Sequence, residues 1–122
     1  MYDHIGLRVS NLQASLRFYS AALATLGLTV CTQDASSAGL GPKDEPGMWL
    51  HQSTKGTEGR GAHIALHAPN RAAVDCFHRK GLKAGGRDNG APGARIDCSP
   101  TYYAAFLIDP DGNNVEAVTQ LS

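Results

Sequence analysis

The sequence lacks several features that mark specialised classes of protein. Its 122 residues carry eleven basic and eleven acidic side chains, so the formal net charge is zero, and no segment mixes clustered Lys or Arg with aromatic residues. A surface that binds nucleic acid needs such a basic cluster. No hydrophobic run approaches the roughly 20 residues that cross a membrane, and residues 1–9 lack the basic and apolar regions of a secretory leader. We therefore expect a cytoplasmic protein that binds neither nucleic acid nor a membrane.

Cysteine and nucleotide-binding motifs are equally sparse. The three cysteines, Cys31, Cys76 and Cys98, form an odd set without a Cys-x-x-Cys spacing, which predicts free thiols rather than a disulfide framework or a zinc knot. The glycines match neither a phosphate-binding loop nor Gly-x-Gly-x-x-Gly after a strand, and no Gly-x-Ser-x-Gly elbow is present. These absences argue against nucleotide binding and serine hydrolysis.

The most informative feature that is present is an internal repeat. Residues 3–11 read Asp-His-Ile-Gly-Leu-Arg-Val-Ser-Asn and return, 59 positions later, as Ala-His-Ile-Ala-Leu-His-Ala-Pro-Asn at residues 62–70. The offset pairs His4 with His63. Because two copies related by a pseudo-two-fold axis can bring equivalent residues to one cleft, the repeat predicts two histidines that share a site.

The length of the chain fits one compact domain built from two half-modules. The repeat places the first module at about residues 1–52 and the second at about residues 62–122. Residues 53–61 are polar and Gly-rich, which is typical of a linker. Such a linker lets the modules face each other within one chain or across a dimer, and both arrangements stay open.

Each module is expected to contain a strand, a helix and further strands. Residues 3–9 alternate apolar and polar side chains, which predicts a strand, and Ser10 or Asn11 can cap a helix whose apolar stripe runs to Leu26. The remaining elements follow from the same periodicities and from turn residues. In the first module we expect strands at residues 28–31 and 48–52 and a loop at 34–47. In the second module we expect strands at residues 62–68, 102–108 and 114–119. We also expect a helix there at about residues 71–84, capped by Asn70, and a long loop at 87–100.

Three side chains are candidate metal ligands. His4, His63 and Glu116 lie on the first strand of each module and on the last strand of the chain, with strand parity opposite to that of their apolar neighbours. Two imidazoles and a carboxylate suit a divalent transition metal and leave positions open for water or substrate. A carboxylate on an apolar strand needs a partner, and a metal ion is a suitable one. The alternative is that each histidine is only a hydrogen-bonded strand residue.

Other polar residues near these ligands are candidates for substrate binding. His67 shares a strand face with His63, and Arg8 occupies the position equivalent to His67 in the first module. Arg8 either binds an anionic group of a substrate or forms a salt bridge with a strand carboxylate. Tyr102 and Tyr103 point to opposite faces of one strand, and we assign Tyr103 to the cleft.

Two histidines and one loop have plainer expected roles. His51 and His78 are expected at the surface or on a helix face. The loop at residues 87–100 contains Asn-Gly and Pro-Gly turns. It is either a lid over the cleft or a plain surface loop.

Four segments carry a resemblance to a known family: residues 3–9, the helix with Phe18-Tyr19 followed by Leu26-Gly27-Leu28, residues 62–66 and residues 106–116. They resemble the vicinal oxygen chelate superfamily, which includes glyoxalase I, bleomycin and fosfomycin resistance proteins and extradiol dioxygenases. The resemblance covers nearly the whole chain. It implies an α+β fold of paired βαβββ modules, a cupped mixed sheet with helices outside, and a divalent ion inside: zinc, nickel, manganese or iron. It also implies that His4, His63 and Glu116 are ligands and that the protein is a homodimer that binds a small molecule.

Departures from well-known members narrow the expected chemistry. Glyoxalase I has a fourth ligand, a glutamate on the last strand of its first module, whereas residues 48–52 contain no carboxylate. Extradiol dioxygenases carry a tyrosine three residues before the Asp-Pro turn, where this chain has Phe106, so dioxygenase activity is disfavoured. The resemblance implies a lyase- or isomerase-type enzyme for a substrate with vicinal oxygens, with Glu116 as ligand and base. The alternative is a non-catalytic protein that sequesters a small molecule, as bleomycin resistance proteins do.

Overall fold

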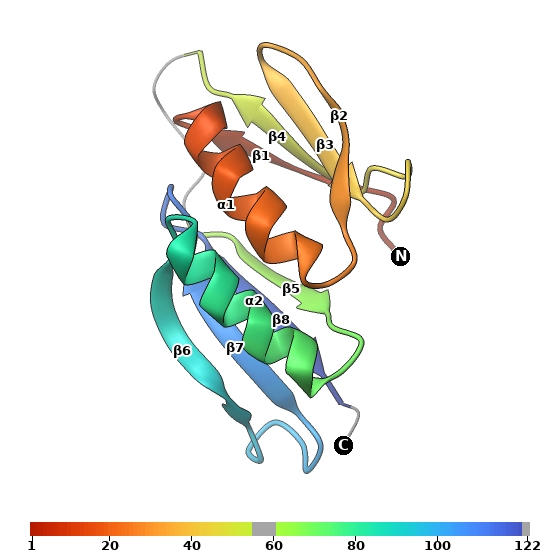
Figure 1. The fold of residues 1–122 in the computed structure, drawn as a ribbon, viewed down its shortest axis with the longest axis vertical. Helices are drawn as coiled ribbons and strands as arrows, with labels where there is room; N and C mark the ends of the chain where they lie inside the picture. Colours follow the sequence, from red (N-terminus) through yellow and green to blue (C-terminus); the bar gives the residue numbers. More distant parts are fainter. Residues whose placement is uncertain (55–60, 121–122) are drawn as a thin grey trace.

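The order strand, helix and three strands occurs twice along the chain (Figure 1). The computed structural model describes residues 1–54 and 61–120, so most of the proposed linker lies outside the described residues. The first module contains β1 (Ile5–Val9), α1 (Leu12–Ala24), β2 (Thr29–Gln33), β3 (Ser37–Gly41) and β4 (Met48–Gln52). The second contains β5 (His63–His67), α2 (Arg71–Lys83), β6 (Arg87–Ala94), β7 (Tyr103–Ile108) and β8 (Asn114–Thr119).

Each module forms its own four-stranded mixed sheet. The strand orders are β1-β4-β3-β2 and β5-β8-β7-β6. In each sheet the first and last strands of the module pair in parallel, and the other pairs are antiparallel. The registers are equivalent, because Gly6 lies opposite Trp49 in the first sheet as Ala65 lies opposite Glu116 in the second. The expected α+β fold of paired βαβββ modules is confirmed, with one four-stranded mixed sheet in each module.

The two helices cover the same side of the molecule (Figure 1). The strands β1 and β5, each at an edge of its sheet, line one groove from its two sides. We call the side of each sheet that faces away from its helix the open face. The modules are therefore set edge to edge, and their open faces lie on the same side of the molecule.

Both helices begin in the same way because the repeat supplies the same capping residue. The side-chain oxygen of Asn11 accepts a hydrogen bond from the N–H of Ala14 at 3.0 Å, and that of Asn70 accepts one from Ala73 at 2.8 Å. Such a cap satisfies an N–H group that the first turn of a helix leaves unpaired. The predicted cap at Asn70 is confirmed, and Asn11 rather than Ser10 caps the first helix.

The two modules share one hydrophobic core where the helices meet the sheets. Phe18 of α1 and Phe77 of α2, which the repeat pairs, are both fully buried. Gly81 lets α2 approach the second sheet closely, because a Cβ at this position would lie 2.2 Å from Cδ1 of Leu107. A larger residue at Gly81 would therefore push the helix away from the sheet that carries the candidate site.

A buried polar turn ties the second module to the first. Asp109, which follows β7, is 2% exposed, and its carboxylate accepts hydrogen bonds from the Tyr19 hydroxyl of α1 at 2.5 Å and from the backbone N–H groups of Asp111 and Asn113 at 2.8 Å. Burial, together with the negative charge of Asp109, raises the pKa of Tyr19 far above its usual value, so the hydroxyl stays a donor. The Ser10 hydroxyl donates to Asp111 at 2.5 Å. The Asp-Pro-Asp-Gly turn thus joins the modules as well as reversing the chain.

Two segments that the sequence predicts as loops contain strands. The strand β3 lies within residues 34–47, and β6 lies within residues 87–100. Their sequences, Ser-Ala-Gly-Leu-Gly and Arg-Asp-Asn-Gly-Ala-Pro-Gly-Ala, are too rich in small residues to show the alternation that marks a strand. Pairing with β4 and β7 holds them in the sheets, and register shifts accommodate the glycines of β6. The prediction of loops was wrong here, and most of residues 87–100, expected as a lid or a plain surface loop, form an edge strand.

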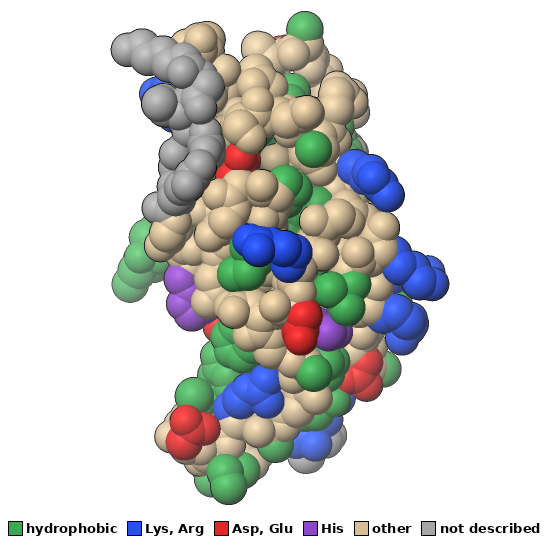
Figure 2. Space-filling model, turned by 90° about the vertical axis from the view of Figure 1, so that its left-hand side faces the viewer, with side chains coloured by type: hydrophobic (Ala, Val, Ile, Leu, Met, Phe, Trp, Pro, Cys, Tyr) green, Lys and Arg blue, Asp and Glu red, His purple; other side chains and the backbone are tan. Residues whose placement is uncertain are grey.

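The surface and the cysteines show no specialised feature among the described residues. Basic and acidic side chains are both spread over the face shown in Figure 2. Neither of the two described helices is long and apolar enough to cross a membrane. The three cysteines carry free thiols, as predicted.

Candidate functional site

The open face of the second sheet carries a buried carboxylate. Glu116 stands on β8 between Ala65 of β5 and Phe106 of β7, and only 2% of the residue is exposed. Its Oε1 accepts a hydrogen bond from Nε2 of His63 at 2.8 Å, and its Oε2 accepts one from the hydroxyl of Tyr102. A carboxylate in the interior needs such partners because burial disfavours its charge. Both carboxylate oxygens are therefore held in defined positions.

The hydroxyl of Tyr102 acts as a hydrogen-bond donor in this arrangement. Its hydrogen bond to Glu116, together with burial and the negative charge of Glu116, raises the pKa of Tyr102 to about 12. The phenol therefore keeps its proton at neutral pH. Because Tyr102 fixes Oε2, the oxygen that faces His63 is the one left for binding a cation or moving a proton.

The donor atoms of His63 and Glu116 fit one side of a divalent metal site. Nε2 of His63 and Oε1 of Glu116 lie 2.8 Å apart, and two ligands bound about 2.0–2.2 Å from one ion lie about 3 Å apart when they subtend a right angle. The His63 side chain is 55% exposed and that of Glu116 only 3%, so solvent reaches the pair from the His63 side. A nitrogen donor and an oxygen donor suit zinc, nickel, manganese and iron. The pair matches two of the three predicted ligands.

The structure does not bring His4 to this pair. Within residues 1–54 and 61–120, no three histidine, cysteine or carboxylate side chains gather closely enough to hold a metal ion. Nδ1 of His4 instead lies 2.7 Å from a carboxylate oxygen of Asp3. His4 and His63 do line the same groove, of about 530 Å³, between β1 and β5. One chain alone therefore places His63 with Glu116 and leaves His4 apart from them.

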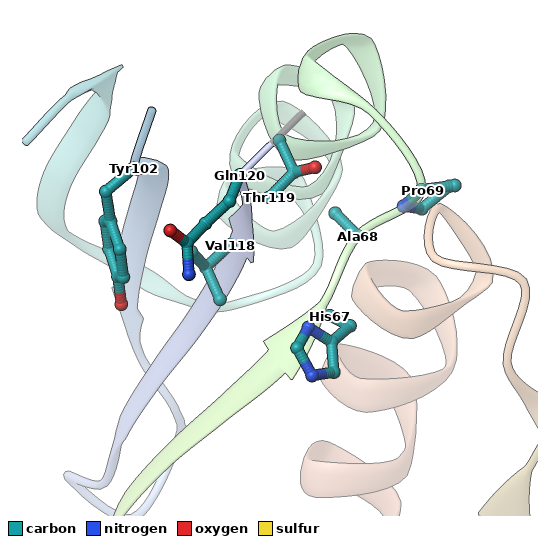
Figure 3. Close-up of a pocket in the computed structure, with 7 residues that line it drawn as sticks. All are labelled: His67, Ala68, Pro69, Tyr102, Val118, Thr119 and Gln120. Carbon is teal, nitrogen blue, oxygen red and sulfur yellow. The ribbon is translucent and has the colours of Figure 1, made fainter. Parts of the chain in front are cut away.

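A cavity of about 480 Å³ lies beside Tyr102, the hydrogen-bond partner of the buried carboxylate. Figure 3 shows the Tyr102 ring and the His67 imidazole on opposite sides of this cavity, with Val118 between them. Since the hydroxyl of Tyr102 also binds Glu116, one side chain connects the cavity to the carboxylate. His67, a predicted substrate-binding residue, lies where it can contact a molecule in the cavity.

Tyr103 lies on the helix side of the second sheet. Its hydroxyl donates a hydrogen bond to Oδ1 of Asp75 in α2 at 2.6 Å, and the Arg71 guanidinium lies 4.7 Å from its ring centre. The two tyrosines face opposite sides, as expected, but the structure places Tyr102 rather than Tyr103 on the open face. The predicted assignment of Tyr103 to the cleft is corrected accordingly.

The register could have identified Tyr102 from the sequence. The Asp-Pro-Asp-Gly turn fixes how β7 pairs with β8, and this register puts Phe106 opposite Glu116. Side chains alternate along a strand, so the residue four positions before Phe106 shares its face. Counting back from the turn therefore selects Tyr102 as the partner of Glu116.

The equivalent place on the first sheet holds an aromatic residue. Trp49 of β4 lies opposite Gly6, as Glu116 lies opposite the corresponding residue of the second module. The rings of Trp49 and His51 stack with centroids 6.3 Å apart and 12° between their planes. Together with His4 and Gly6 they line a groove of about 390 Å³. The first module thus offers imidazoles and an indole where a second carboxylate would stand.

The remaining predicted residues lie outside the His63–Glu116 pair. Arg8 of β1 is exposed and lies opposite His51, so it belongs to the open face of the first sheet. His78 lies on α2, as expected for a helix-face residue, and its Nε2 is 2.8 Å from a carboxylate oxygen of Asp88. Arg8 is therefore not on the sheet that carries the buried carboxylate.

Comparison with known families agrees with this fold and its repeat. Residues 2–117 match the Glyoxalase/Bleomycin resistance protein/Dioxygenase superfamily. The chain belongs to this superfamily. A comparison with curated proteins gave no match.

Solved structures of the glyoxalase superfamily share the architecture. A glyoxalase/bleomycin resistance protein from Albidiferax ferrireducens T118 is 28% identical, with a TM-score of 0.82 over 97% of each chain. A putative glyoxalase from Bacillus halodurans is 24% identical, with a TM-score of 0.74 over 97% of this chain and 94% of that one. The V278E mutant of glyoxalase I from Zea mays is 25% identical, with a TM-score of 0.72 over 96% of this chain and 45% of that one.

Proposed function

We propose that this superfamily member binds a divalent metal ion, zinc, nickel, manganese or iron, at His63 and Glu116 and acts on a small molecule with vicinal oxygens. The observation that carries the proposal is the burial of Glu116 between His63 and Tyr102 on the open face. The 2.8 Å spacing of the nitrogen and oxygen donors is compatible with one ion. The cavity of about 480 Å³ that Tyr102 and His67 line has room for a small ligand.

A homodimer is proposed to complete the ligand set, with His4 supplied by a second copy of the chain. In one chain, His4 lies beside the first sheet, whereas His63 and Glu116 belong to the second. Modules set edge to edge with their helices on one side leave a broad sheet surface to be covered (Figure 1). In a two-fold symmetric dimer, the first module of each copy would face the second module of the other. This contact would form two equivalent sites. This arrangement accounts for the separation of His4 from its expected partners.

Glu116 is the proposed acid–base group. A bound metal ion would hold the neighbouring oxygens of the substrate and stabilise negative charge on them. Oε1 of Glu116, once released from the ion, would take a proton from the adjacent carbon and return it, while Tyr102 holds Oε2 and keeps the carboxylate oriented. His67 and Tyr102 line the cavity and position the rest of the substrate. Proton movement of this kind belongs to a lyase or isomerase.

A second candidate function is sequestration of a small molecule without chemistry. The observation that favours it is the stacked pair of Trp49 and His51 on the first sheet, which offers a flat surface to a planar ligand. Stoichiometric binding without a product would support sequestration, and metal-dependent turnover would support the enzyme. We place either activity in the cytoplasm, where the three free thiols would stay reduced.

The metal content of protein purified without a histidine tag tests the proposal. The wild type is expected to hold about one divalent ion per chain. His63→Ala is expected to lose the ion, because removing one ligand lowers the affinity of the site for the metal. His78→Ala is the matched control, since His78 binds Asp88 on the helix side, and it should keep the ion. Light scattering of the same samples should give about twice the chain mass.

Two results would contradict these proposals in different ways. Full metal occupancy in the double variant His4→Ala/His63→Ala would show that the ion binds elsewhere. A monomer that still binds one ion per chain, and loses it in Glu116→Gln, would leave the metal site standing and remove the shared arrangement.

A further inference from the structure

Arg95 lies on the same open face as the His63–Glu116 pair. Its guanidinium carbon is 5.5 Å from the ring centre of Phe106, and Phe106 stands directly opposite Glu116 in the register of β7 and β8. The centroid of the same ring is 6.4 Å from that of the His63 imidazole. One aromatic ring therefore separates a permanent positive charge from the buried carboxylate and its histidine.

The edge strand β6 is shaped to hold this guanidinium. A Cβ at Gly93 would lie 2.9 Å from Nη1 of Arg95, and a Cβ at Gly90 would lie 3.4 Å from its Nη2. Nη2 also donates a hydrogen bond to the carbonyl of Ala91 at 2.8 Å. The guanidinium thus lies beside two glycines and the Phe106 ring, which hold it near the site.

The guanidinium has hydrogen-bond donors to spare. Among the described residues, the Ala91 carbonyl is the acceptor that it meets, and none of the ion pairs involves it. Arginine has five N–H donors and stays charged at every physiological pH. Arg95 is only partly exposed, and its backbone N–H donates at 2.7 Å to the carbonyl of Tyr102, which lines the 480 Å³ cavity. A guanidinium held against the Phe106 ring with N–H donors unused is suited to bind a carboxylate or phosphate through paired hydrogen bonds.

We infer that Arg95 binds an anionic group, a carboxylate or a phosphate, of the small molecule whose vicinal oxygens lie at His63 and Glu116. The inference rests on the proposed function and adds the substrate class: an acidic molecule whose anionic end is several atoms away from its vicinal oxygens. Arg8 is not needed for this contact, because it lies on the other sheet.

A matched pair of probes tests the inference on the metal-loaded protein. The two probes, 2-oxoglutarate and 2-oxopentanoate, share their carbon chain and the neighbouring oxygens at one end, and differ in the distal carboxylate, which is a methyl group in 2-oxopentanoate. By calorimetry, the wild type should bind 2-oxoglutarate roughly 10- to 100-fold more tightly, as expected for hydrogen bonds to a charged group. Arg95→Gln should abolish this preference without changing the metal content or the affinity for 2-oxopentanoate.

Two further variants control for loss of charge and loss of structure. Arg87→Gln removes an exposed arginine from β6, the strand that Arg95 follows, and should keep the preference. Arg95→Lys keeps the charge without the planar fork and should retain a reduced preference. A wild type without a preference, including one that binds neither probe, overturns the inference, as does an unchanged preference in Arg95→Gln.

A metal-free measurement separates this inference from the proposed metal site. In the presence of EDTA, glutarate and inorganic phosphate are titrated while the Nε–Hε resonance of Arg95 is followed by NMR. A saturable shift supports an anion site, and the probe that produces it distinguishes a carboxylate from a phosphate. A saturable shift, combined with no metal in the protein as purified, would leave the anion site at Arg95 standing and remove the metal proposal. Metal in the protein as purified, with no shift from either anion, would support the metal site and overturn the inference about Arg95.

Discussion

Trp49 and Glu116 occupy equivalent positions in the two sheets, yet one presents an indole and the other a buried carboxylate. The neighbouring strands compensate for this difference in size. Trp49 lies against Gly39, where a Cβ would come within 3.0 Å of the indole, whereas Glu116 lies opposite Phe106. Each sheet therefore carries one large aromatic residue at this position. It stands on β4, the last strand, in the first module and on β7, the strand before the last, in the second. The repeat has kept its backbone register while the groups capable of chemistry have diverged.

The helices show a similar asymmetry in the side-chain hydrogen bonds that they form with the sheets and turns. Tyr19 of α1 donates its hydroxyl to Asp109 in the other module. The residue that the repeat pairs with Tyr19 is His78, which binds Asp88 within its own module. These hydrogen bonds from Tyr19 and Ser10 are accepted by carboxylates of the second module, which also holds the candidate site.

Placing a carboxylate at position 49 is expected to have the largest effect on this comparison. The wild type should turn over neither the hemithioacetal of methylglyoxal and glutathione nor catechol efficiently with zinc, nickel, manganese or iron(II), because a missing acid–base group costs about 10²- to 10⁴-fold. Trp49→Glu should raise glyoxalase kcat/KM by about 10²-fold or more, and Trp49→Phe should not. A wild-type kcat/KM of ~10⁴ to 10⁸ M⁻¹s⁻¹, the range of native substrates, would refute the argument from the missing ligand.

Removing the tie between modules should have the next largest effect. Asp109→Ala is expected to lower the free energy of unfolding by about 3 kcal/mol, because the Tyr19 hydroxyl and two backbone N–H groups lose their buried acceptor. Pro42→Ala, at the equivalent position of the first module, should change it by less than about 0.5 kcal/mol. Urea denaturation followed by circular dichroism measures both. Similar losses in the two variants would show that the turns contribute equally.

The ionisation of Tyr102 offers a smaller and more local test. Its pKa of about 12 is raised chiefly by the hydrogen bond to Glu116, so Glu116→Gln should lower it toward about 10, the ordinary value. Since the folded-state pKa exceeds the unfolded one, this group stabilises the fold fully below about pH 10, and the contribution is lost as the pH rises through the folded pKa. Ultraviolet titration measures the step, and Tyr102→Phe identifies it. A step that Glu116→Gln leaves in place would contradict the assignment.

The helix caps should give the smallest effects and should treat the two modules alike. Asn11→Ala and Asn70→Ala each remove one capping hydrogen bond and should each cost about 1 kcal/mol. Thermal unfolding of the two variants, compared with the wild type, measures the loss as a lowered Tm. A much larger cost at one cap would show that the modules contribute unequally to stability even where their sequences agree.

The sequence predicts what depends on local periodicity. The strands that begin each module, both helices and the last strand follow from alternation, apolar stripes and asparagine caps. The pairing of His63 with Glu116 follows in part from strand parity, because both side chains had to leave the apolar face. The small-residue strands β3 and β6 could not be found in this way, since pairing with their neighbours rather than their own composition holds them.

The placement of residues from different modules is the part that local patterns do not determine. The separation of His4 from Glu116 depends on how the modules are set against each other, which no local pattern encodes. The sequence does not predict a role for Arg95, because its position depends on contacts with Gly90, Gly93 and Phe106 that form only when β6 pairs with β7. Tyr102, in contrast, can be predicted from the sequence, because the Asp-Pro turn determines the register of β7 and β8.

The Asp109 turn also determines how the molecule is expected to open. The amide hydrogens of Asp111 and Asn113 point at the Asp109 carboxylate, so they can exchange with solvent only when that carboxylate is released. Release requires the turn to separate from Tyr19 in the other module. A turn at the end of a hairpin should therefore show the slow hydrogen exchange of the sheet interior. The two halves of the chain should then unfold as one cooperative unit, although each has its own sheet.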